Sequence, residues 1–309
     1  RLSVTDRCNF RCRYCLPPGF PRAVKSAPPL PPRELVRLVR TLCGQYPITR
    51  VKLTGGEPLV RREIVEIVSK LSSIEGIEEI SMTTNGALLA SRAAALKRAG
   101  LRRVNVSLDS LDPDRFAALT HGGRLDRTLA GIEAALDAGL KPVKLNSVLL
   151  RSTWEREVPA LLEYSAARGL EVRFIELMRT GTDAEWVEGE FISADLVRRW
   201  LERHGEVAAL PELPEGPARR TRLRWAGREI TVGWITPLSH PFCGDCSRLR
   251  MDARGTLRRC LMDDAVFPFA DRADRLGEKE TRNDLDRYLA GKRPPATMGS
   301  EATMNAVGG

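Results

Sequence analysis

Strand-like and helical segments alternate along the first two thirds of the chain, and this alternation constrains the fold more than any other feature. Short apolar runs fit strands, and segments with apolar residues at helical spacing follow them. The expected strands cover residues 2–4, 50–54, 79–83, 103–108, 143–150 and 171–177. The expected helices cover 32–45, 62–71, a segment ending at 99, and then 125–138, 154–168 and 194–203. Gly100, Gly139 and Gly169 follow three of these helices, as helix-ending glycines often do.

Six β-then-α units in succession predict parallel strands joined by right-handed crossovers. Such an α/β chain can form an incomplete TIM-like barrel, (β/α)6, in which functional side chains lie at the C-terminal ends of the strands. Unusual residues fall at or near those ends, namely Gly55-Gly56-Glu57, Thr83-Thr84-Asn85, Ser107-Leu108-Asp109, Asn146 and Glu176-Leu177-Met178. An open Rossmann-type sheet is the alternative, but no G-x-G-x-x-G follows the first strand.

The pattern changes near residue 205. Prolines interrupt the chain at positions 211, 214 and 217, and residues 222–236 then predict an antiparallel hairpin that turns near Ala226-Gly227. We therefore expect two domains. Residues 1–205 would form the partial barrel, and residues 206–309 would form a C-terminal extension with the hairpin, a second cysteine cluster and a Gly-Gly tail.

Three cysteines, Cys8, Cys12 and Cys15, form a Cys-x3-Cys-x2-Cys run directly after the first expected strand. Three thiolates on one loop can hold a cubic iron–sulfur cluster and leave its fourth iron without a protein ligand. Zinc usually takes four protein ligands in a closed structural site, and no fourth Cys or His lies nearby. The spacing therefore predicts a cluster with an open iron rather than a zinc knuckle or three unrelated thiols.

A second triplet consists of Cys243, Cys246 and Cys260. Its Cys-x2-Cys pair fits either zinc or an iron–sulfur cluster, and His240 could be a fourth zinc ligand. Arg248 and Arg250 lie within this triplet, and in an extended chain their side chains project to the same side. That arrangement suits a polyphosphate or a purine edge, although two solvated surface arginines would look the same.

Charge and cysteine usage narrow the functional class. The 309 residues carry 49 Lys+Arg against 40 Asp+Glu, and this net charge of +9 favours anionic partners. The seven cysteines form two triplets plus Cys43, a pattern that suits metal binding in a reducing compartment, so we expect a cytoplasmic protein. We expect Cys43 to be a small buried hydrophobe. No apolar stretch approaches the roughly 18 residues that span a bilayer. His121, His204 and His240 follow no catalytic spacing.

The first triplet with Tyr14, together with Gly55-Gly56-Glu57-Pro58, resembles the radical S-adenosylmethionine enzymes. With the second triplet, the Arg-x-Arg pair and the terminal Gly-Gly, the whole chain resembles one of their families, the GTP 3′,8-cyclases of molybdenum-cofactor biosynthesis. The resemblance implies that a 5′-deoxyadenosyl radical removes the C3′ hydrogen of GTP. Ring closure onto C8 would then give (8S)-3′,8-cyclo-7,8-dihydroguanosine 5′-triphosphate.

The resemblance also implies roles for individual residues. The two triplets would each hold a [4Fe-4S] cluster. The S-adenosylmethionine contacts would be Tyr14, Gly56, Ser107 and Met178. The GTP contacts would be Arg1, Lys52, Thr83, Lys144, Arg248, Leu249 and Arg250. Catalysis would be assisted by Arg248, Arg250, Gly308 and Gly309. At position 52, many relatives carry arginine. The lysine of this chain keeps the positive charge but cannot make the two parallel hydrogen bonds of a guanidinium.

The resemblance implies further partners. These are GTP as the substrate, cyclic pyranopterin monophosphate synthase as the downstream enzyme, and a reductant protein that the sequence does not identify. It implies neither a membrane nor a nucleic acid, and it leaves a monomer and a homodimer open. Two other functions fit parts of the pattern. A radical peptide-modifying enzyme usually has more C-terminal cysteines, and a zinc-stabilised nucleic-acid-binding protein would use the positive charge and the Cys-x2-Cys pair.

Overall fold

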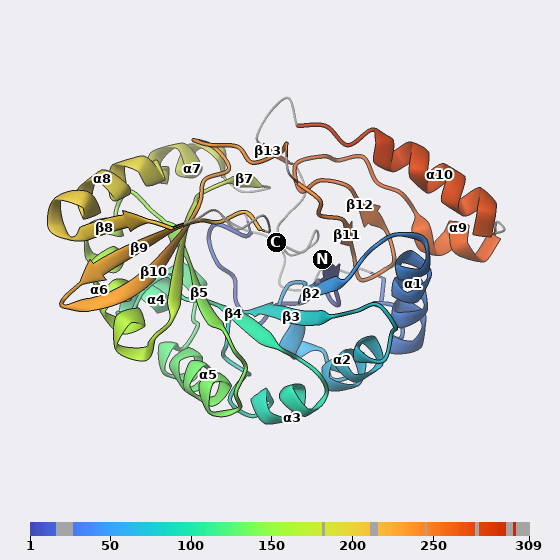
Figure 1. Cartoon of the computed structure of the whole chain (residues 1–309), viewed down its shortest axis with the longest axis horizontal. Coiled ribbons are helices and arrows are strands. Elements are labelled where there is room, and N and C mark those ends of the chain that lie inside the picture. Colours follow the sequence, from blue (N-terminus) through green and yellow to red (C-terminus); the bar gives the residue numbers. More distant parts are fainter. Residues whose placement is uncertain are drawn as a thin grey trace.

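Six parallel strands form the centre of the fold, with helices around their outer side (Figure 1). The computed structural model describes residues 1–16, 27–180, 183–210, 216–244, 246–275, 278–294 and 299–300. The six strands are β1 (Leu2–Ser3), β2 (Arg50–Thr54), β3 (Glu79–Thr84), β4 (Arg103–Ser107), β5 (Val143–Leu149) and β6 (Glu171–Glu176). Each pairs in parallel with the next one along the chain. The sequential order confirms the predicted partial barrel, whereas a Rossmann sheet reverses its strand order.

The helices between the strands are close to those predicted. They are α1 (Pro32–Gln45), α2 (Ile64–Ser72), α3 (Ala93–Arg98), α5 (Leu125–Asp137), α6 (Trp154–Arg168) and α8 (Ala194–His204). Proline at the first position starts α1, and a left-handed Gly169 ends α6. Cys43 is partly buried and packs against the core, as expected for a small apolar residue. Among the described residues, no helix is long and apolar enough to cross a membrane.

The C-terminal part extends the barrel sheet at both edges. Strand β10 (Arg228–Ile235) pairs in parallel with β6, and β11 (Arg250–Met251) pairs in parallel with β1. Beyond β10, the sheet continues with β9 (Arg219–Trp225) and then β8 (Glu206–Ala209). Beyond β11, it continues with β12 (Leu257–Arg258). Within the described residues, the two edge strands β8 and β12 do not pair with each other, so the barrel is not closed by hydrogen bonds. Strands from both sides of residue 205 belong to one sheet, so the division into two domains at that residue stays a prediction.

The predicted hairpin is confirmed. Strands β9 and β10 pair antiparallel, and Ala226 and Gly227 connect them with φ angles of 48° and 75°. Two positive φ values in a two-residue loop match the right-handed twist of the flanking strands. At the barrel edge, the rings of Phe174 and Trp234 lie 5.6 Å apart and pack β6 against β10.

Side chains alternate along the central strands, with apolar residues toward the helices and polar residues toward the barrel interior. On β3, Ile80 and Met82 belong to the apolar core, while Thr83 lines the interior cavity. On β4, Val104 and Val106 are fully buried in the same core, and Asn105 between them is polar and lines the cavity. This period of two produces a polar barrel interior surrounded by an apolar layer.

Several short elements were not predicted. They are the strands β8, β11 and β12, the helices α4 (Pro113–Thr120), α7 (Ala184–Glu190), α9 (Phe269–Arg275) and α10 (Glu278–Ala290), the short helix Pro58–Val60, and the paired strands β7 (Arg179–Thr180) and β13 (Gly299–Ser300). Two of them matter for the site. The end of α4 holds the first cysteine loop, and α10 holds the second cysteine region.

Candidate active site

A cavity of about 480 Å³ lies at the C-terminal ends of the parallel strands, and both cysteine triplets line it. Most residues singled out from the sequence meet there. The predicted residues in its wall are Arg1, Cys8, Cys12, Tyr14, Cys15, Lys52, Gly56, Thr83, Ser107, Met178, Cys243, Cys246, Arg248, Arg250 and Cys260. The fold therefore brings both ends of the described chain to one site.

The first triplet lies on a loop that is held by the end of α4. The backbone amides of Arg11 and Arg13 donate to the carbonyl oxygens of Thr120 and Leu119, at 3.0 and 3.1 Å. All three thiols are free. Burial raises the pKa of Cys8 to about 11, and it also raises the pKa of Cys12 and of Cys15. Thiolates at these positions therefore need a positive partner, which iron would supply.

Gly55 and Gly56 allow the end of β2 to lie directly against this loop. A Cβ added to Gly56 would lie 2.4 Å from the carbonyl oxygen of Arg7, and one added to Gly55 would lie 2.3 Å from that of Thr5. Any larger residue would push the cysteine loop away. The glycine pair therefore shapes the cradle of the first triplet through backbone packing.

Glu57 ties the ends of two neighbouring strands together. Its buried carboxylate accepts hydrogen bonds from the Thr84 hydroxyl at 2.7 Å, the Asn85 amide at 2.7 Å and the Leu59 amide at 3.0 Å. Burial raises the pKa of Glu57 to about 7. The loop after β3, which lines the cavity, is thereby fixed relative to the glycine pair.

Asp109 links Tyr14 to strands β4 and β5. Its hydroxyl donates to Asp109 Oδ2 at 2.7 Å, and the backbone amide of Val148 donates to Oδ1 at 2.8 Å. Burial raises the pKa of Asp109 to about 6. Ser107, at the end of β4, and Met178, just after β6, line the same cavity as Tyr14 and Asp109.

The second triplet lies in the loops that follow β10 and β12. The Arg248 Nε donates to Cys246 Sγ at 3.3 Å, and the guanidinium lies 5.0 Å from the centre of the Phe242 ring. Burial opposes ionisation of Cys246, but the charge and hydrogen bonds of Arg248, together with the charge of Lys292, outweigh it and lower the pKa of that thiol to about 7. His240 instead pairs with Asp195 at 2.7 Å, which argues against its role as a fourth zinc ligand.

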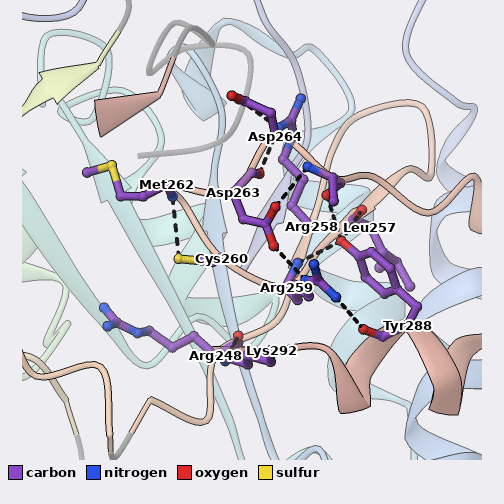
Figure 2. A network of polar contacts seen from close by, with 11 residues as sticks. Arg248, Leu257, Arg258, Arg259, Cys260, Met262, Asp263, Asp264, Tyr288 and Lys292 are labelled. Carbon is purple, nitrogen blue, oxygen red and sulfur yellow. Dashed lines mark hydrogen bonds and ion pairs between the residues drawn. The ribbon is translucent and has the colours of Figure 1, made fainter. Parts of the chain in front are cut away.

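Figure 2 shows how α10 holds the Cys260 segment. The Arg259 side chain donates to Asp263 at 2.5 Å and to the Tyr288 carbonyl oxygen at 2.9 Å, and the Arg259 amide donates to the Tyr288 hydroxyl at 3.0 Å. Lys292, which follows α10, donates to the Arg248 carbonyl oxygen at 2.6 Å. One helix thus supports both Cys260 and the Arg-x-Arg segment.

The described part of the cavity wall carries more cations than its few carboxylates can neutralise. Lys52, Arg1 and Arg173 all line it. Burial, with the charges of Arg1 and Arg103, holds the pKa of Lys52 well below its ordinary value. Burial and the charge of Arg250 likewise lower the pKa of Arg1. Because buried cations repel one another, a bound anion would stabilise all of them.

Two predicted GTP contacts lie outside this wall. The Lys144 ammonium pairs with Glu171 at 2.8 Å, in a layer below the cavity, and Glu171 also accepts from Arg173 at 2.6 Å. Leu249 contributes its carbonyl oxygen to the Arg1 backbone nitrogen at 2.7 Å. Their contact with GTP stays a prediction. Gly308 and Gly309 lie outside the described residues.

Sequence reasoning missed Asn105 and Arg173, and it gave no role to Asn146 or Asp109; all four line the cavity. Strand parity could have found them. Asn105 lies two residues before Ser107 on β4, so both side chains point to the same face. Arg173 holds the corresponding inward position on β6, beside Asn146.

The donor sets fit two iron–sulfur clusters. Each triplet offers three free thiols in the wall of a shared cavity, and the charges of the thiols within each triplet influence one another's pKa. Three thiolates can hold a [4Fe-4S] cluster and leave its fourth iron without a protein ligand, whereas a structural zinc site usually takes four protein ligands.

Comparisons with known proteins agree with this geometry. Residues 2–164 match the Radical SAM superfamily model, and residues 170–296 match the model called Molybdenum Cofactor Synthesis C. The GTP 3′,8-cyclase of Rhodopirellula baltica is 39% identical, over 100% of this chain and 89% of that protein. The GTP 3′,8-cyclase of Pelotomaculum thermopropionicum is 47% identical, over 85% and 81%.

Solved structures share the fold at low identity. SuiB of Streptococcus suis matches with a TM-score of 0.51 and 18% identity, over 66% of this chain and 44% of that one. HydG, a maturase of the [FeFe]-hydrogenase, also matches with a TM-score of 0.51, at 16% identity over 65% and 47%. The similarity to the cyclases favours that reading over a peptide-modifying enzyme or a zinc-stabilised nucleic-acid-binding protein. The chain belongs to the GTP 3′,8-cyclase family of the radical S-adenosylmethionine superfamily.

Proposed function

We propose that this protein converts GTP to (8S)-3′,8-cyclo-7,8-dihydroguanosine 5′-triphosphate, an early step of molybdenum-cofactor biosynthesis. The observation that carries the proposal is one cavity that is lined by both cysteine triplets and by a group of cations. The chain matches 89% and 81% of the length of the two cyclases, which supports a shared activity.

Each cysteine triplet would hold a [4Fe-4S] cluster, and S-adenosylmethionine would bind beside the first. Its contacts would come from Tyr14, Gly56, Ser107 and Met178. Bound there and reduced, S-adenosylmethionine supplies a 5′-deoxyadenosyl radical, which can take a hydrogen atom from a substrate carbon. The chain's own residues determine which carbon is presented and keep water from the site.

The cations would hold the substrate in one orientation. Lys52, Arg1 and Arg173 are buried or half-buried around the cavity, where a triphosphate would neutralise them. Arg248 and Arg250 lie beside the second triplet and would fix the guanine end. Holding both ends of GTP leaves its ribose facing the S-adenosylmethionine contacts, and positioning of this kind accounts for a large share of enzymatic rate enhancement.

The test is anaerobic incubation of the reconstituted protein with S-adenosylmethionine, a reductant and GTP, followed by chromatography. We expect 5′-deoxyadenosine and the cyclised nucleotide to form together, and only with GTP. ATP serves as the control nucleotide. Deoxyadenosine formation that does not depend on GTP, or that occurs without a cyclised product, would refute the assignment.

The remaining partners belong to the same proposal. The product would pass to cyclic pyranopterin monophosphate synthase, and a separate reductant protein would supply the electron. The seven free thiols favour a reducing compartment such as the cytoplasm. Both a monomer and a homodimer are compatible with the site, because the residues proposed here come from one chain.

A further inference from the structure

Two buried side-chain amide oxygens in the cavity wall lack hydrogen-bond partners among the described residues. The side-chain oxygens of Asn105 and Asn146 make no hydrogen bond to any described residue, although both residues line the cavity. Asn105 is only 2% exposed. A buried acceptor without a donor costs about 1–3 kcal/mol, so such groups are rare unless a ligand or water completes them. The pair therefore indicates where a bound molecule donates hydrogen bonds.

The strand register places both amides beside residues that the proposed function assigns to the cofactor or to GTP. Asn146 on β5 pairs with Ser107 of β4 on one side and with Arg173 of β6 on the other. Asn105 on β4 pairs with Thr83 of β3 and with Lys144 of β5. One amide thus lies directly between a proposed S-adenosylmethionine contact and a buried arginine.

The chemistry of an acceptor selects the ligand group. A fully ionised triphosphate has only acceptors, so it cannot satisfy an amide oxygen. The part of a nucleoside triphosphate that adjoins the phosphates and carries donors is the ribose, through its 2′ and 3′ hydroxyls. With the phosphates at Arg173 and Lys52, these hydroxyls would come next to the asparagines.

We propose that Asn105 and Asn146 accept hydrogen bonds from the ribose hydroxyls of the substrate nucleotide and thereby select ribonucleotides over deoxyribonucleotides. The inference rests on the proposed function, because it requires a nucleoside triphosphate in this cavity. It adds a selection at the sugar, which the cations cannot provide. It also orients the ribose carbon atoms relative to Ser107, because the hydroxyls fix the rotation of the ring.

The test is equilibrium binding of GTP, 2′-deoxyGTP and 3′-deoxyGTP to the cluster-loaded protein without S-adenosylmethionine, so that no turnover occurs. We expect the unaltered protein to bind GTP roughly tenfold more tightly than at least one deoxy analogue, the value of about one hydrogen bond. In Asn105→Ala and Asn146→Ala, GTP affinity should fall by a similar factor and the preference should shrink toward one.

Two further variants separate recognition from general damage. Asn146→Asp keeps an acceptor oxygen, so it should bind all three nucleotides more weakly through charge repulsion while the preference is retained. Gln45→Ala removes a buried amide oxygen that likewise lacks a partner among the described residues but lies outside the cavity wall, so it should change neither affinity nor preference. The ratio of two affinities is insensitive to losses that affect every nucleotide equally.

The outcomes distinguish this inference from the proposed function. If GTP binds but neither deoxy analogue is disfavoured, the asparagines do not contact the hydroxyls and the inference is wrong, while the proposed function stands. If the unaltered protein shows the preference and both alanine variants keep it, the inference is also wrong. If no nucleotide binds, the proposed function and the inference both fail.

Discussion

Removing the Glu171 carboxylate should destabilise the protein in a way that a polyphosphate partly reverses. Glu171 accepts from Lys144 at 2.8 Å, from Arg173 at 2.6 Å and from Arg220 at 3.0 Å. The side chains of Lys144, Glu171 and Arg173 are 5%, 10% and 11% exposed, and that of Arg220 is 24% exposed. Glu171→Gln leaves the charges of Lys144, Arg173 and Arg220 without the anion that they share.

The expected loss follows from the burial of these groups. Breaking a buried pair costs about 3–5 kcal/mol, and partial exposure of one partner favours the lower value, so we expect roughly 3 kcal/mol. At roughly 2 °C for each kcal/mol in a chain of this size, the melting temperature should fall by about 6 °C. The matched control is Glu79→Gln. Glu79 pairs with Arg103 at 2.7 Å, both side chains are 19% exposed, and the loss should be smaller.

The assay is thermal unfolding of both variants with and without inorganic triphosphate. A bound anion stabilises the folded state in proportion to the logarithm of its concentration over its dissociation constant. Because Arg173 lines the cavity, triphosphate can replace part of the lost charge, so the rise in melting temperature should be larger for Glu171→Gln than for unaltered protein. An equal rise in both, or a loss no larger than that of Glu79→Gln, would refute the reasoning.

Three further perturbations test other parts of the structure. Burial and the Arg173 charge lower the pKa of Lys144 from 10.5 to about 8, so between these pH values the unfolded state binds more protons and stability rises with pH. Relative to Lys144→Met, denaturant unfolding of the unaltered protein should therefore gain about 2–3 kcal/mol between pH 7 and pH 10, and a flat difference would contradict the pKa. Gly56→Ala should displace the cysteine loop and lower the iron content after reconstitution, whereas Gly44→Ala, with no atom within 4 Å of the added Cβ, should not. Cys260→Ser should reduce iron from about eight to about four per chain, and an unchanged iron content would show that Cys260 is not a ligand.

Much of the fold was predictable because its elements are encoded locally. Helices Pro32–Gln45 and Trp154–Arg168 and strand Arg50–Thr54 have the predicted bounds. In the first helix, apolar residues recur at helical spacing, and in the second, Gly169 marks the end. Helix α4 was not predicted, because its apolar residues span little more than one turn and so give no clear helical period. Asp112, which caps its N-terminus, is the local signal that could have identified it.

The candidate site was predictable only in part. Both cysteine triplets and the glycine pair stand out because their spacing is a property of the chain itself. Arg173 and Asn105 do not stand out, since an arginine or asparagine in a strand has many explanations until its neighbours are known. The ion pair between Lys144 and Glu171 on the adjacent strand was likewise not predictable, because it depends on the register of β5 and β6, and the contact of Lys144 with GTP stays a prediction.

By itself, the order of residues determined six β-then-α units, two triplets of metal-binding thiols and an excess of positive charge. These features depend on spacing along the chain, with periods of 2 and 3.6 and short intervals between ligands. Only the tertiary structure decided that β10 extends one edge of the barrel while β11 extends the other, which brings Cys243, Cys246 and Cys260 to the same cavity as the first triplet. Which strand edges pair depends on the packing of the whole chain, because any unpaired edge offers the same row of backbone donors and acceptors.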